Sequence, residues 1–582
     1  MRIVLVRQIS QGFFFAVFLW FCVVTTFGEQ WWQLRGWPIN WFFQLDPLTA
    51  IGTVLTTGKL YAPLLWALAT MILTIVFGRF FCGWVCPFGA LHHFVGFLGS
   101  STRNTSERIH RNRYRKAQGI KYLVLIFLLL SALVPPGMNS LQTGLLDPIA
   151  LLTRSVNLVL LPIMDRLTHT VSVTPRFYEH AWLILTIFLA VVFLNLLIPR
   201  FYCRFICPLG ALLAIPARLS LWRIGKISSP CRDCRTCEAG CEGGCEPGGT
   251  IRTSECMLCF NCRDDCKDQL IGYRPRRSAA GELPNPDISR RGFVIAALSG
   301  VFAVPAIRLG NKLGANYYPT LIRPPGALPE PQFLQRCAKC GQCMRVCPTN
   351  VLQPAGIEPG LEALWTPTLN NRIGSSGCQL NCVACGHVCP TAAIRPISLE
   401  EKLGLAEFAP KGPLKIGTAF IDRGRCLPWA MDSPCIVCQE NCPVSPKAIY
   451  TRPFFSTLRN ATFMVALADQ TAVQVSEGSL TPHAFATGDY YCGITDQADN
   501  EPRQIIANTQ NVITISKDNI WKNPPAARQR IDILIRLQRP YIDIEKCTGC
   551  GICEHECPVS GKRAIRVSAE NESRSSARKL RI

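Results

Sequence analysis

Cysteines at short, repeated spacings are the residues of this chain most able to do chemistry. The sequence holds 31 of them in 582 residues, and most stand in six groups of four. Closely spaced thiolates suit a [4Fe-4S] cube, which takes three cysteines from one group and a fourth from another. The six groups are Cys231, Cys234, Cys237 and Cys241; Cys256, Cys259, Cys262 and Cys266; Cys337, Cys340, Cys343 and Cys347; Cys378, Cys382, Cys385 and Cys389; Cys426, Cys435, Cys438 and Cys442; and Cys547, Cys550, Cys553 and Cys557. The pattern predicts six [4Fe-4S] clusters.

The first two groups have the spacing of a bacterial two-cluster ferredoxin, Cys-x2-Cys-x2-Cys-x3-Cys. Neither has the usual proline after its last cysteine, and Cys245, which stands before a Glu-Pro pair, can replace Cys241 as the fourth ligand. The sequence does not decide between these two thiols. Each of the four later groups ends in Cys-Pro. We expect the regular groups that start at Cys337 and Cys547 to share one cluster pair, and the two irregular groups to share the other.

Other uses of these cysteines fit the spacing less well. Zinc ribbons place two Cys-x2-Cys knuckles well apart, and disulfides between such close neighbours would be strained. No Cys-x2-Cys-His motif occurs, so covalent haem is not expected in this chain. Cys22 falls in an apolar stretch and is interpreted as a packing residue, whereas the sequence gives Cys492 no role.

Apolar stretches predict that the chain crosses a membrane. They run roughly over 12–28, 61–81, 120–135, 181–198 and, more weakly, 292–307, and a helical span needs about 20 residues. Arginine and lysine crowd the loop between the second and third stretches, whereas the loop after the first stretch is poor in them. The positive-inside rule then places the N-terminus in the cytoplasm, as in a protein of a bacterial inner membrane.

The formal charge of +22 has an explanation in this topology. Much of it lies beside apolar segments, where lysine and arginine set the orientation of the spans. No groove-reading module is present, so nucleic-acid binding is not expected.

The membrane part repeats itself. The segment Arg79-Phe-Phe-Cys82-Gly-Trp-Val-Cys86-Pro87 matches Arg200-Phe-Tyr-Cys203-Arg-Phe-Ile-Cys207-Pro208, and an Asp-Pro pair precedes each copy at Asp46 and Asp147. Two hairpins of the same orientation would bring both Cys-x3-Cys-Pro turns to equal depth. We therefore predict that Cys82, Cys86, Cys203 and Cys207 share one site at the cytoplasmic membrane surface. Such a site could bind an additional cluster or act as a redox-active dithiol pair. The alternative is that each motif only caps a helix.

The predicted fold class is an α-helical membrane domain, with four spans in two repeated hairpins plus a fifth span, joined to α+β ferredoxin-like [4Fe-4S] domains. The predicted domains are 1–215 in the membrane, 216–288 as a cytoplasmic two-cluster domain, 289–308 as the fifth span, and 309–582 as a four-cluster periplasmic domain with an insert at about 450–544. Arg290 and Arg291 precede the fifth stretch as in a twin-arginine signal. That route exports a domain already folded around its clusters.

In order, spacing and repeat, the sequence resembles a NapH-type membrane ferredoxin fused to a NapG-type or MauM-type twin-arginine ferredoxin. The resemblance covers nearly the whole chain apart from the insert and the basic tail. It implies a quinol dehydrogenase-type protein that takes electrons from the membrane quinone pool and delivers them to a periplasmic cytochrome or reductase. The missing prolines, Cys245 and the insert depart from the pattern and leave the terminal partner open.

Two other functions compete with this one. In a transmembrane relay, a cytoplasmic reductant loads the first two cysteine groups, for maturation or reactivation of an exported metalloenzyme. A purely structural anchor would have no use for six clusters. If quinol is the donor, His92 and His93 are candidate catalytic residues, because they follow the first Cys-x3-Cys-Pro motif and could accept protons. The alternative is that they are interfacial histidines without such a task.

Overall fold

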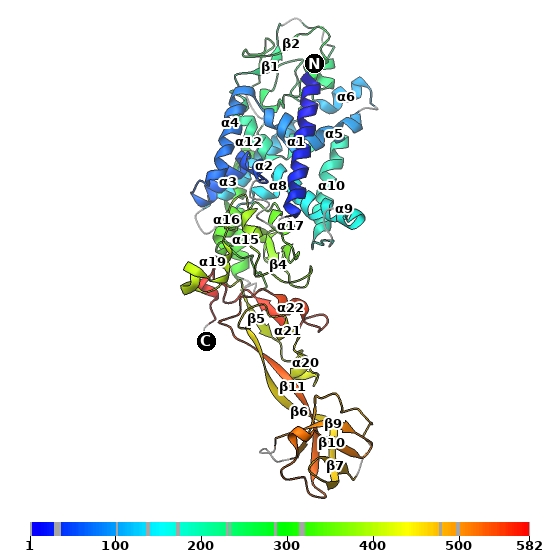
Figure 1. Cartoon of the computed structure of the whole chain (residues 1–582). Coiled ribbons are helices and arrows are strands. Elements are labelled where there is room, and N and C mark those ends of the chain that lie inside the picture. The colour runs from blue at the N-terminus through cyan, green and yellow to red at the C-terminus, as the bar shows by residue number, and fades with distance from the viewer. Residues whose placement is uncertain are drawn as a thin grey trace. The chain divides into compact units, whose positions relative to one another are not determined.

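The computed structural model describes residues 3–27, 37–100, 103–134, 140–169, 175–228, 231, 234–283, 288–313, 320–476, 480–495 and 501–580. The chain forms two compact units, and each is described by itself. The first unit is Met1–Ser375, Asn381–Ile416 and Ser573–Ala577, and the second is Ser376–Leu380, Gly417–Glu572 and Arg578–Ile582. Helices make up most of the first unit, and long strands dominate the second (Figure 1).

Helices build the first unit, and most of them are apolar. They are α1 (Ile3–Thr26), α2 (Trp41–Gln44), α3 (Pro47–Thr57), α4 (Trp66–Phe77), α5 (Pro87–Ser100), α6 (Thr105–Asn112), α7 (Ile120–Leu133), α8 (Pro148–Ser155), α9 (Leu161–Thr168), α10 (Ala181–Leu197), α11 (Phe201–Phe205), α12 (Pro208–Ala217) and α15 (Arg290–Leu313). The two Asp-Pro pairs of the repeat start α3 and α8. The Asp46 carboxylate accepts the Leu48 N–H at 2.9 Å, and the Asp147 carboxylate accepts the Ile149 N–H at 2.7 Å. Each aspartate thus caps a helix whose first residue is proline.

Two small lobes carry cysteine groups in this unit. The first lobe, residues 223–274, contains the antiparallel pair β1 (Arg223–Lys226) and β2 (Ile271–Arg274) with α13 (Thr236–Ala239) and α14 (Asn261–Asp264). The second lobe, residues 320–375 and 381–416, contains α16 (Glu330–Arg336), α17 (Gln342–Arg345), the antiparallel pair β3 (Leu352–Pro354) and β4 (Pro367–Leu369), α18 (Ala384–His387) and α19 (Leu399–Leu403).

The two lobes pack against opposite ends of α1. Ile3 and Val4, at its start, pack on the cysteine-rich core of the first lobe. The Thr26 hydroxyl, at its end, accepts a hydrogen bond from Arg345 Nε of the second lobe at 2.8 Å. A helix of 24 residues is about 36 Å long at 1.5 Å per residue. That length exceeds the roughly 30 Å of a bilayer's hydrocarbon core.

Among the residues that the structure describes, three helical segments are long and apolar enough to cross a membrane, namely Ile3–Thr26, Lys116–Leu133 and Pro148–Thr168. The predicted stretches at 61–81 and 181–198 form shorter apolar helices, Ala62–Phe77 and Ala181–Leu197. The segment Pro148–Thr168 was not among the predicted stretches. It lies along the second lobe, because Arg154 donates to the Lys339 carbonyl at 3.0 Å and Asp165 pairs with Arg345 at 2.9 Å.

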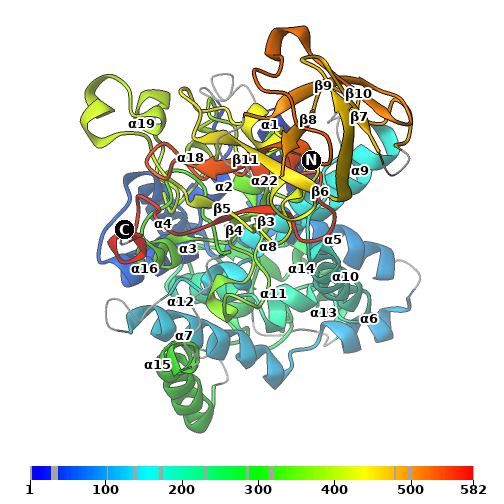
Figure 2. The same ribbon diagram turned by 90° about the horizontal axis from the view of Figure 1, so that it is seen from below.

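The weaker fifth stretch forms the 24-residue helix α15, which packs beside α7 (Figure 2). The two helices can approach closely because α15 has glycines where it contacts α7. A Cβ at Gly300 would lie 2.6 Å from the Phe127 carbonyl oxygen, and one at Gly292 would touch Leu123. The earlier glycine of α15 lies beside the earlier residue of α7, and the later glycine lies beside the later residue. The two helices therefore run parallel.

The second unit joins a ferredoxin-like part to a small barrel. The ferredoxin-like part contains β5 (Thr418–Ile421) paired with β12 (Ile565–Ser568), and the helices α20 (Leu427–Ala430), α21 (Val437–Glu440) and α22 (Ile552–Glu556). The insert forms a closed barrel of β6 (Ile449–Ala468), β7 (Ala472–Val475), β8 (Tyr490–Ile494), β9 (Arg503–Asn508), β10 (Val512–Ile515) and β11 (Arg530–Ile542). Cys492 is fully buried in the barrel core with Trp521 and Ile533. Its place identifies it as a core packing residue.

Asp165→Asn should destabilise the first unit, because Asp165 and Arg345 are both fully buried and form an ion pair. Removing one partner of a buried pair leaves an uncompensated charge, which costs about 3–5 kcal/mol. The measurement is the thermal unfolding midpoint of the purified protein in detergent.

The matched control is Glu107→Gln, which breaks the exposed pair with Arg103 and should change stability by less than about 1 kcal/mol. Equal shifts for the two variants would contradict the assigned role of the buried pair.

Candidate metal centres and cavity

The four cysteines of the repeated motif converge in the first unit. Cys82 lies in a π-helical turn, Phe81–Val85, and Cys203 lies in α11, while Cys86 and Cys207 precede the prolines that begin α5 and α12. The four thiols are close enough to act on one another electrostatically. The structure therefore brings together the four residues that the sequence predicted to share a site.

The two copies of the motif make equivalent backbone contacts to their second cysteine. The Gly89 N–H donates to Cys86 Sγ at 3.5 Å, and the Gly210 N–H donates to Cys207 Sγ at 3.2 Å. These contacts place equivalent backbone donors on equivalent thiols of the two copies.

The two repeat-related arginines cross to the opposite copy. Arg79 lies 4.0 Å from Cys82 Sγ, and its Nη2 is the atom nearest to a Cβ built at Gly210, at 2.9 Å. Arg200 donates to the Cys82 carbonyl at 3.3 Å and lies beside Gly89. Each copy therefore supplies a guanidinium to the other.

The charge of this region fits an anionic group. Arg79 and Arg200 are each only 1% exposed, and Lys121 is fully buried. Glu255 pairs with Lys121 and Glu242 with Arg200, which leaves one guanidinium without a carboxylate of its own. An iron–sulfur cluster with four thiolates is an anion, and N–H···S bonds stabilise it. The donor set of this site therefore fits such a cluster.

The first lobe places both candidate fourth ligands at one point. Cys241 Sγ and Cys245 Sγ lie 3.2 Å apart, and Cys245 also contacts the thiol of Cys256. Cys266 instead lies in the neighbourhood of Cys237. The structure supports exchange between the two groups and leaves both Cys241 and Cys245 available to the second cluster.

The structure corrects the predicted pairing of the later groups. Cys389 lines one small cavity with the three cysteines Cys337, Cys340 and Cys343, so the groups that exchange a ligand are consecutive in the chain. In the second unit Cys557 lines a similar cavity with Cys426, Cys435 and Cys438. The regular groups at Cys337 and Cys547 therefore do not exchange.

The strand pairing of the barrel insert explains why Cys557 lies beside the group that starts at Cys426. Its strands β6 and β11 pair in antiparallel register with Ile449 opposite Ile542. The groups that flank the insert therefore meet at its base, although about a hundred residues separate them. Within the described residues no three His, Cys, Asp or Glu side chains gather closely enough for a single metal ion. A cube instead keeps its four thiolates apart at its corners.

Polar residues join the four-thiol site to the second lobe. Tyr202, next to Cys203, donates its hydroxyl proton to the Leu146 carbonyl. Arg154 acts electrostatically on Tyr202 and Asp147 on one side and on Cys337 and Cys340 on the other. On the opposite flank, Arg200 contacts Met257 Sδ of the first lobe at 3.8 Å. Hydrogen bonds and electrostatic interactions thus connect the four-thiol site with both lobes.

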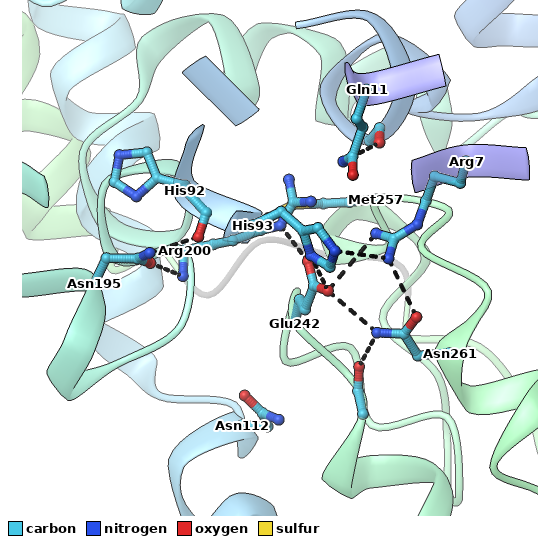
Figure 3. A network of polar contacts seen from close by, with 12 residues as sticks. Arg7, Gln11, His92, His93, Asn112, Asn195, Arg200, Glu242, Met257 and Asn261 are labelled. Atoms are coloured by element: carbon cyan, nitrogen blue, oxygen red, sulfur yellow. Dashed lines mark hydrogen bonds and ion pairs between the residues drawn. The ribbon is translucent and has the colours of Figure 1, made fainter. Parts of the chain in front are cut away.

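A cavity of about 550 Å³ lies between α1, α5 and the first lobe. At its polar side Glu242 pairs with His93 Nδ1 at 2.7 Å and with Arg7 at 3.6 Å, and it accepts a hydrogen bond from Asn261 at 3.1 Å (Figure 3). Burial opposes ionisation, but Arg200, His93 and Arg7 hold the pKa of Glu242 well below its usual range. The cavity therefore contains an ionised carboxylate, Glu242, that is paired with the ring of His93.

The two adjacent histidines have different surroundings. His93 points to Glu242, whereas His92 points away from it (Figure 3). His92 is 1% exposed and packs edge-on against Phe88 with ring centroids 4.6 Å apart. Its ring also stacks near Tyr202, with centroids 6.3 Å apart. Sequence reasoning named His93 but missed Arg7 and Glu242. The stretch predicted at 12–28 begins after Arg7, whereas the helix α1 begins at Ile3 and includes this arginine.

Several segments that carry the cysteine motifs match families of known proteins. A family described as 4Fe-4S binding domain matches residues 60–105 and 181–227, which contain the two Cys-x3-Cys-Pro motifs. Related 4Fe-4S binding domains match residues 334–353 and 538–559. Together with the apolar helices, these matches define an electron-transport protein of the 4Fe-4S ferredoxin type.

Three relatives narrow this class. Protein NirI of Paracoccus denitrificans is 30% identical over 263 residues, which are 43% of this chain and 35% of NirI. The methylamine utilization ferredoxin-type protein MauM of Methylorubrum extorquens is 29% identical over 298 residues, 50% of this chain and 90% of MauM. The ferredoxin-type protein NapG of Escherichia coli is 30% identical over 168 residues, 28% of this chain and 67% of NapG. The chain belongs to the NapG family of ferredoxin-type proteins. No solved structure matches it.

Iron content tests the four-thiol site. Six [4Fe-4S] clusters hold about 24 iron atoms, and a further [4Fe-4S] cluster at the repeated motif would raise the total to about 28. We expect the higher value in protein purified without oxygen, with matching labile sulfide. Cys82→Ser and Cys203→Ser should each lose the additional iron, because serine is a poor ligand for the cluster.

The control is Cys22→Ser, a change at a buried cysteine outside every motif, which should keep the full iron content. A count of about 24 in the unchanged protein would favour a dithiol pair instead. Stoichiometric zinc with little sulfide would overturn the cluster assignment altogether.

Proposed function

We propose that this chain oxidises a membrane quinol at the His93 cavity and passes the electrons through its iron–sulfur clusters to a redox partner across the membrane. The observation that carries the proposal is the placement of two cluster lobes at opposite ends of α1, with four thiols between them. In this proposal the membrane part is of NapH type and is fused to a NapG-type ferredoxin.

The cavity has the properties that quinol oxidation needs. Val4, Leu5 and Phe97 line it beside the polar groups, and Leu5 and Phe97 are 48% and 58% exposed on the surface of the helices. An apolar mouth of this kind would admit a quinone ring from the bilayer. Oxidation releases two protons with two electrons, and the His93 and Glu242 pair can accept and pass on a proton.

In this proposal the first lobe accepts the electrons that leave the quinol. Asn261 donates to Glu242 and stands between the candidate ligands Cys259 and Cys262 in the sequence. An electron that leaves a quinol in the cavity would therefore meet this cluster first. Each bound cluster supplies one-electron redox chemistry.

The side chains beyond the first lobe would shape the rest of the route. Arg79 and Arg200 stabilise negative charge at the four-thiol site, and Tyr202 with Arg154 would carry the connection to the second lobe. The later clusters would then deliver electrons to a periplasmic cytochrome or reductase.

A transmembrane relay from a cytoplasmic reductant is the second candidate. Its support is Cys234, whose thiol is exposed on the first lobe. A soluble electron donor could reach a cluster there without using the cavity. In that case quinol would not reduce the protein, whereas a low-potential soluble donor would.

His93→Gln should slow reduction of the clusters by menadiol by about 100-fold, because it removes the proton acceptor of the cavity. Reduction by dithionite should be unchanged, because dithionite does not need the cavity. The measurement is anaerobic bleaching of the visible cluster absorption after mixing.

His110→Gln, at an exposed histidine of α6, is the control and should behave like the unchanged protein. Full menadiol activity in His93→Gln would remove the cavity from the proposal. Failure of menadiol to reduce even the unchanged protein would leave the relay as the better account.

Protease treatment of spheroplasts should digest the region after α15 and spare the first lobe, because the two are proposed to lie on opposite sides of the membrane. Replacing both Arg290 and Arg291 with lysine should retain the C-terminal region inside and protect it. The control is the same change at Arg276 and Arg277, an exposed pair shortly before the signal. Protection of the C-terminal region in unchanged cells would overturn the topology.

A further inference from the structure

One face of the β6–β11 ribbon in the second unit gathers arginines and aromatic rings. Arg539 lies over Phe454, with its guanidinium carbon 3.3 Å from the ring centroid, and also over Trp429 at 4.7 Å. We call this set the arginine–aromatic face. Its members are Arg423, Trp429, Tyr450, Arg452, Phe454, Arg539 and Tyr541.

The strand register places these residues together. Arg452 is opposite Arg539, and Tyr450 is opposite Tyr541. Alternate residues of a strand share one face, so Tyr450, Arg452 and Phe454 point the same way. The two tyrosine rings stack with centroids 5.8 Å apart, and Trp429 of α20 packs against Tyr541 at 5.6 Å.

The face carries more positive than negative charge. β6 and β11 together contain five arginines and one aspartate. Among the residues that the structure describes, Arg423, Arg452 and Arg539 form no ion pair with a carboxylate. Directly opposed like charges such as Arg452 and Arg539 destabilise a strand pair. Cation–π contacts with the rings offset part of this cost but leave the positive field intact.

The face adjoins a candidate cluster. α20 begins directly after Cys426, and the Trp429 N–H donates to the Cys426 carbonyl at 3.0 Å. Arg539 Nε donates to the Pro428 carbonyl at 3.3 Å. Two further candidate ligands of the same cavity, Cys435 and Cys438, are partly exposed. The charged face therefore adjoins candidate cluster ligands that a partner could approach closely.

We infer that the arginine–aromatic face is the docking surface for an acidic, soluble redox protein. The partner would receive one electron from the cluster held by Cys426, Cys435, Cys438 and Cys557. This inference rests on the electron-transfer part of the proposed function and adds the chemical class of the acceptor. Carboxylates of the partner would supply the counter-charges that the arginines lack, and exposed Tyr450 and Phe454, at 37% and 40%, would provide apolar contact.

The test uses the full chain in detergent, reduced with dithionite from which the excess is removed. Stopped-flow mixing then follows one-electron reduction of ferric to ferrous haem in two acceptors, succinylated cytochrome c and native cytochrome c. These acceptors share one fold and one haem, but the first is acidic and the second basic. We expect faster reduction of the succinylated form, with a rate constant that falls as salt rises.

The variant is Arg423→Gln with Arg452→Gln, which removes two exposed charges from the face. It should lower the second-order rate constant for succinylated cytochrome c about tenfold at low salt and should not slow reduction of the native form. Iron content confirms that the variant keeps its clusters.

The matched control is Arg459→Gln with Arg530→Gln, which removes two exposed arginines of the same ribbon outside the face. It should retain most of the rate. Equal losses in both double variants would assign the effect to net charge and overturn the inference, as would no loss in either. Because dithionite supplies the electrons, failure of quinol oxidation would not affect this result.

Discussion

Buried guanidinium groups beside buried thiols are the constraint on which the membrane part of this protein depends. Arg79 and Arg200 lie in an apolar interior, where an isolated charge is unstable. Glu242 compensates Arg200, whereas Arg79 forms no ion pair among the residues that the structure describes. Four thiolates bound to iron would supply the negative charge that Arg79 lacks, which four protonated thiols would not. The internal repeat builds this site from two copies, because each copy contributes one arginine and two cysteines to a common centre.

The same principle holds the second lobe to the helices. Arg154 and Arg345 are fully buried, and each binds across the contact, Arg154 to the Lys339 carbonyl and Arg345 to Asp165. Polar contacts of this kind are specific in direction, so they fix the lobe in one position. A fixed position would matter for the proposed electron transfer, because it would hold a cluster in the second lobe at a constant separation from the four-thiol site.

The fold determines which cysteine groups lie next to one another. Each group would supply three ligands locally, and the fourth would come from whichever group the fold brings alongside. In the second lobe this is the next group in the chain. In the second unit it is a group on the far side of the barrel, returned by the pairing of β6 with β11. The insert thus adds a domain without separating the ligands, and it leaves an arginine-rich ribbon beside the cluster.

Local residue patterns were enough to predict the candidate chemistry of this protein. Spacing of cysteines is a local property, and so the candidate ligands, the repeated Cys-x3-Cys-Pro motif and its convergence could be predicted from residues alone. Apolar stretches likewise predicted α1, α7 and α15, although the buried segment Pro148–Thr168 was missed because its polar residues interrupt the apolar pattern. The groups that lie close enough to exchange a ligand could be identified only from the fold, since in the second unit this depends on strand register across an insert. The tertiary structure alone separated His93 from His92 and joined Arg7 to Glu242, because residues 235 positions apart meet only when α1 packs on the first lobe.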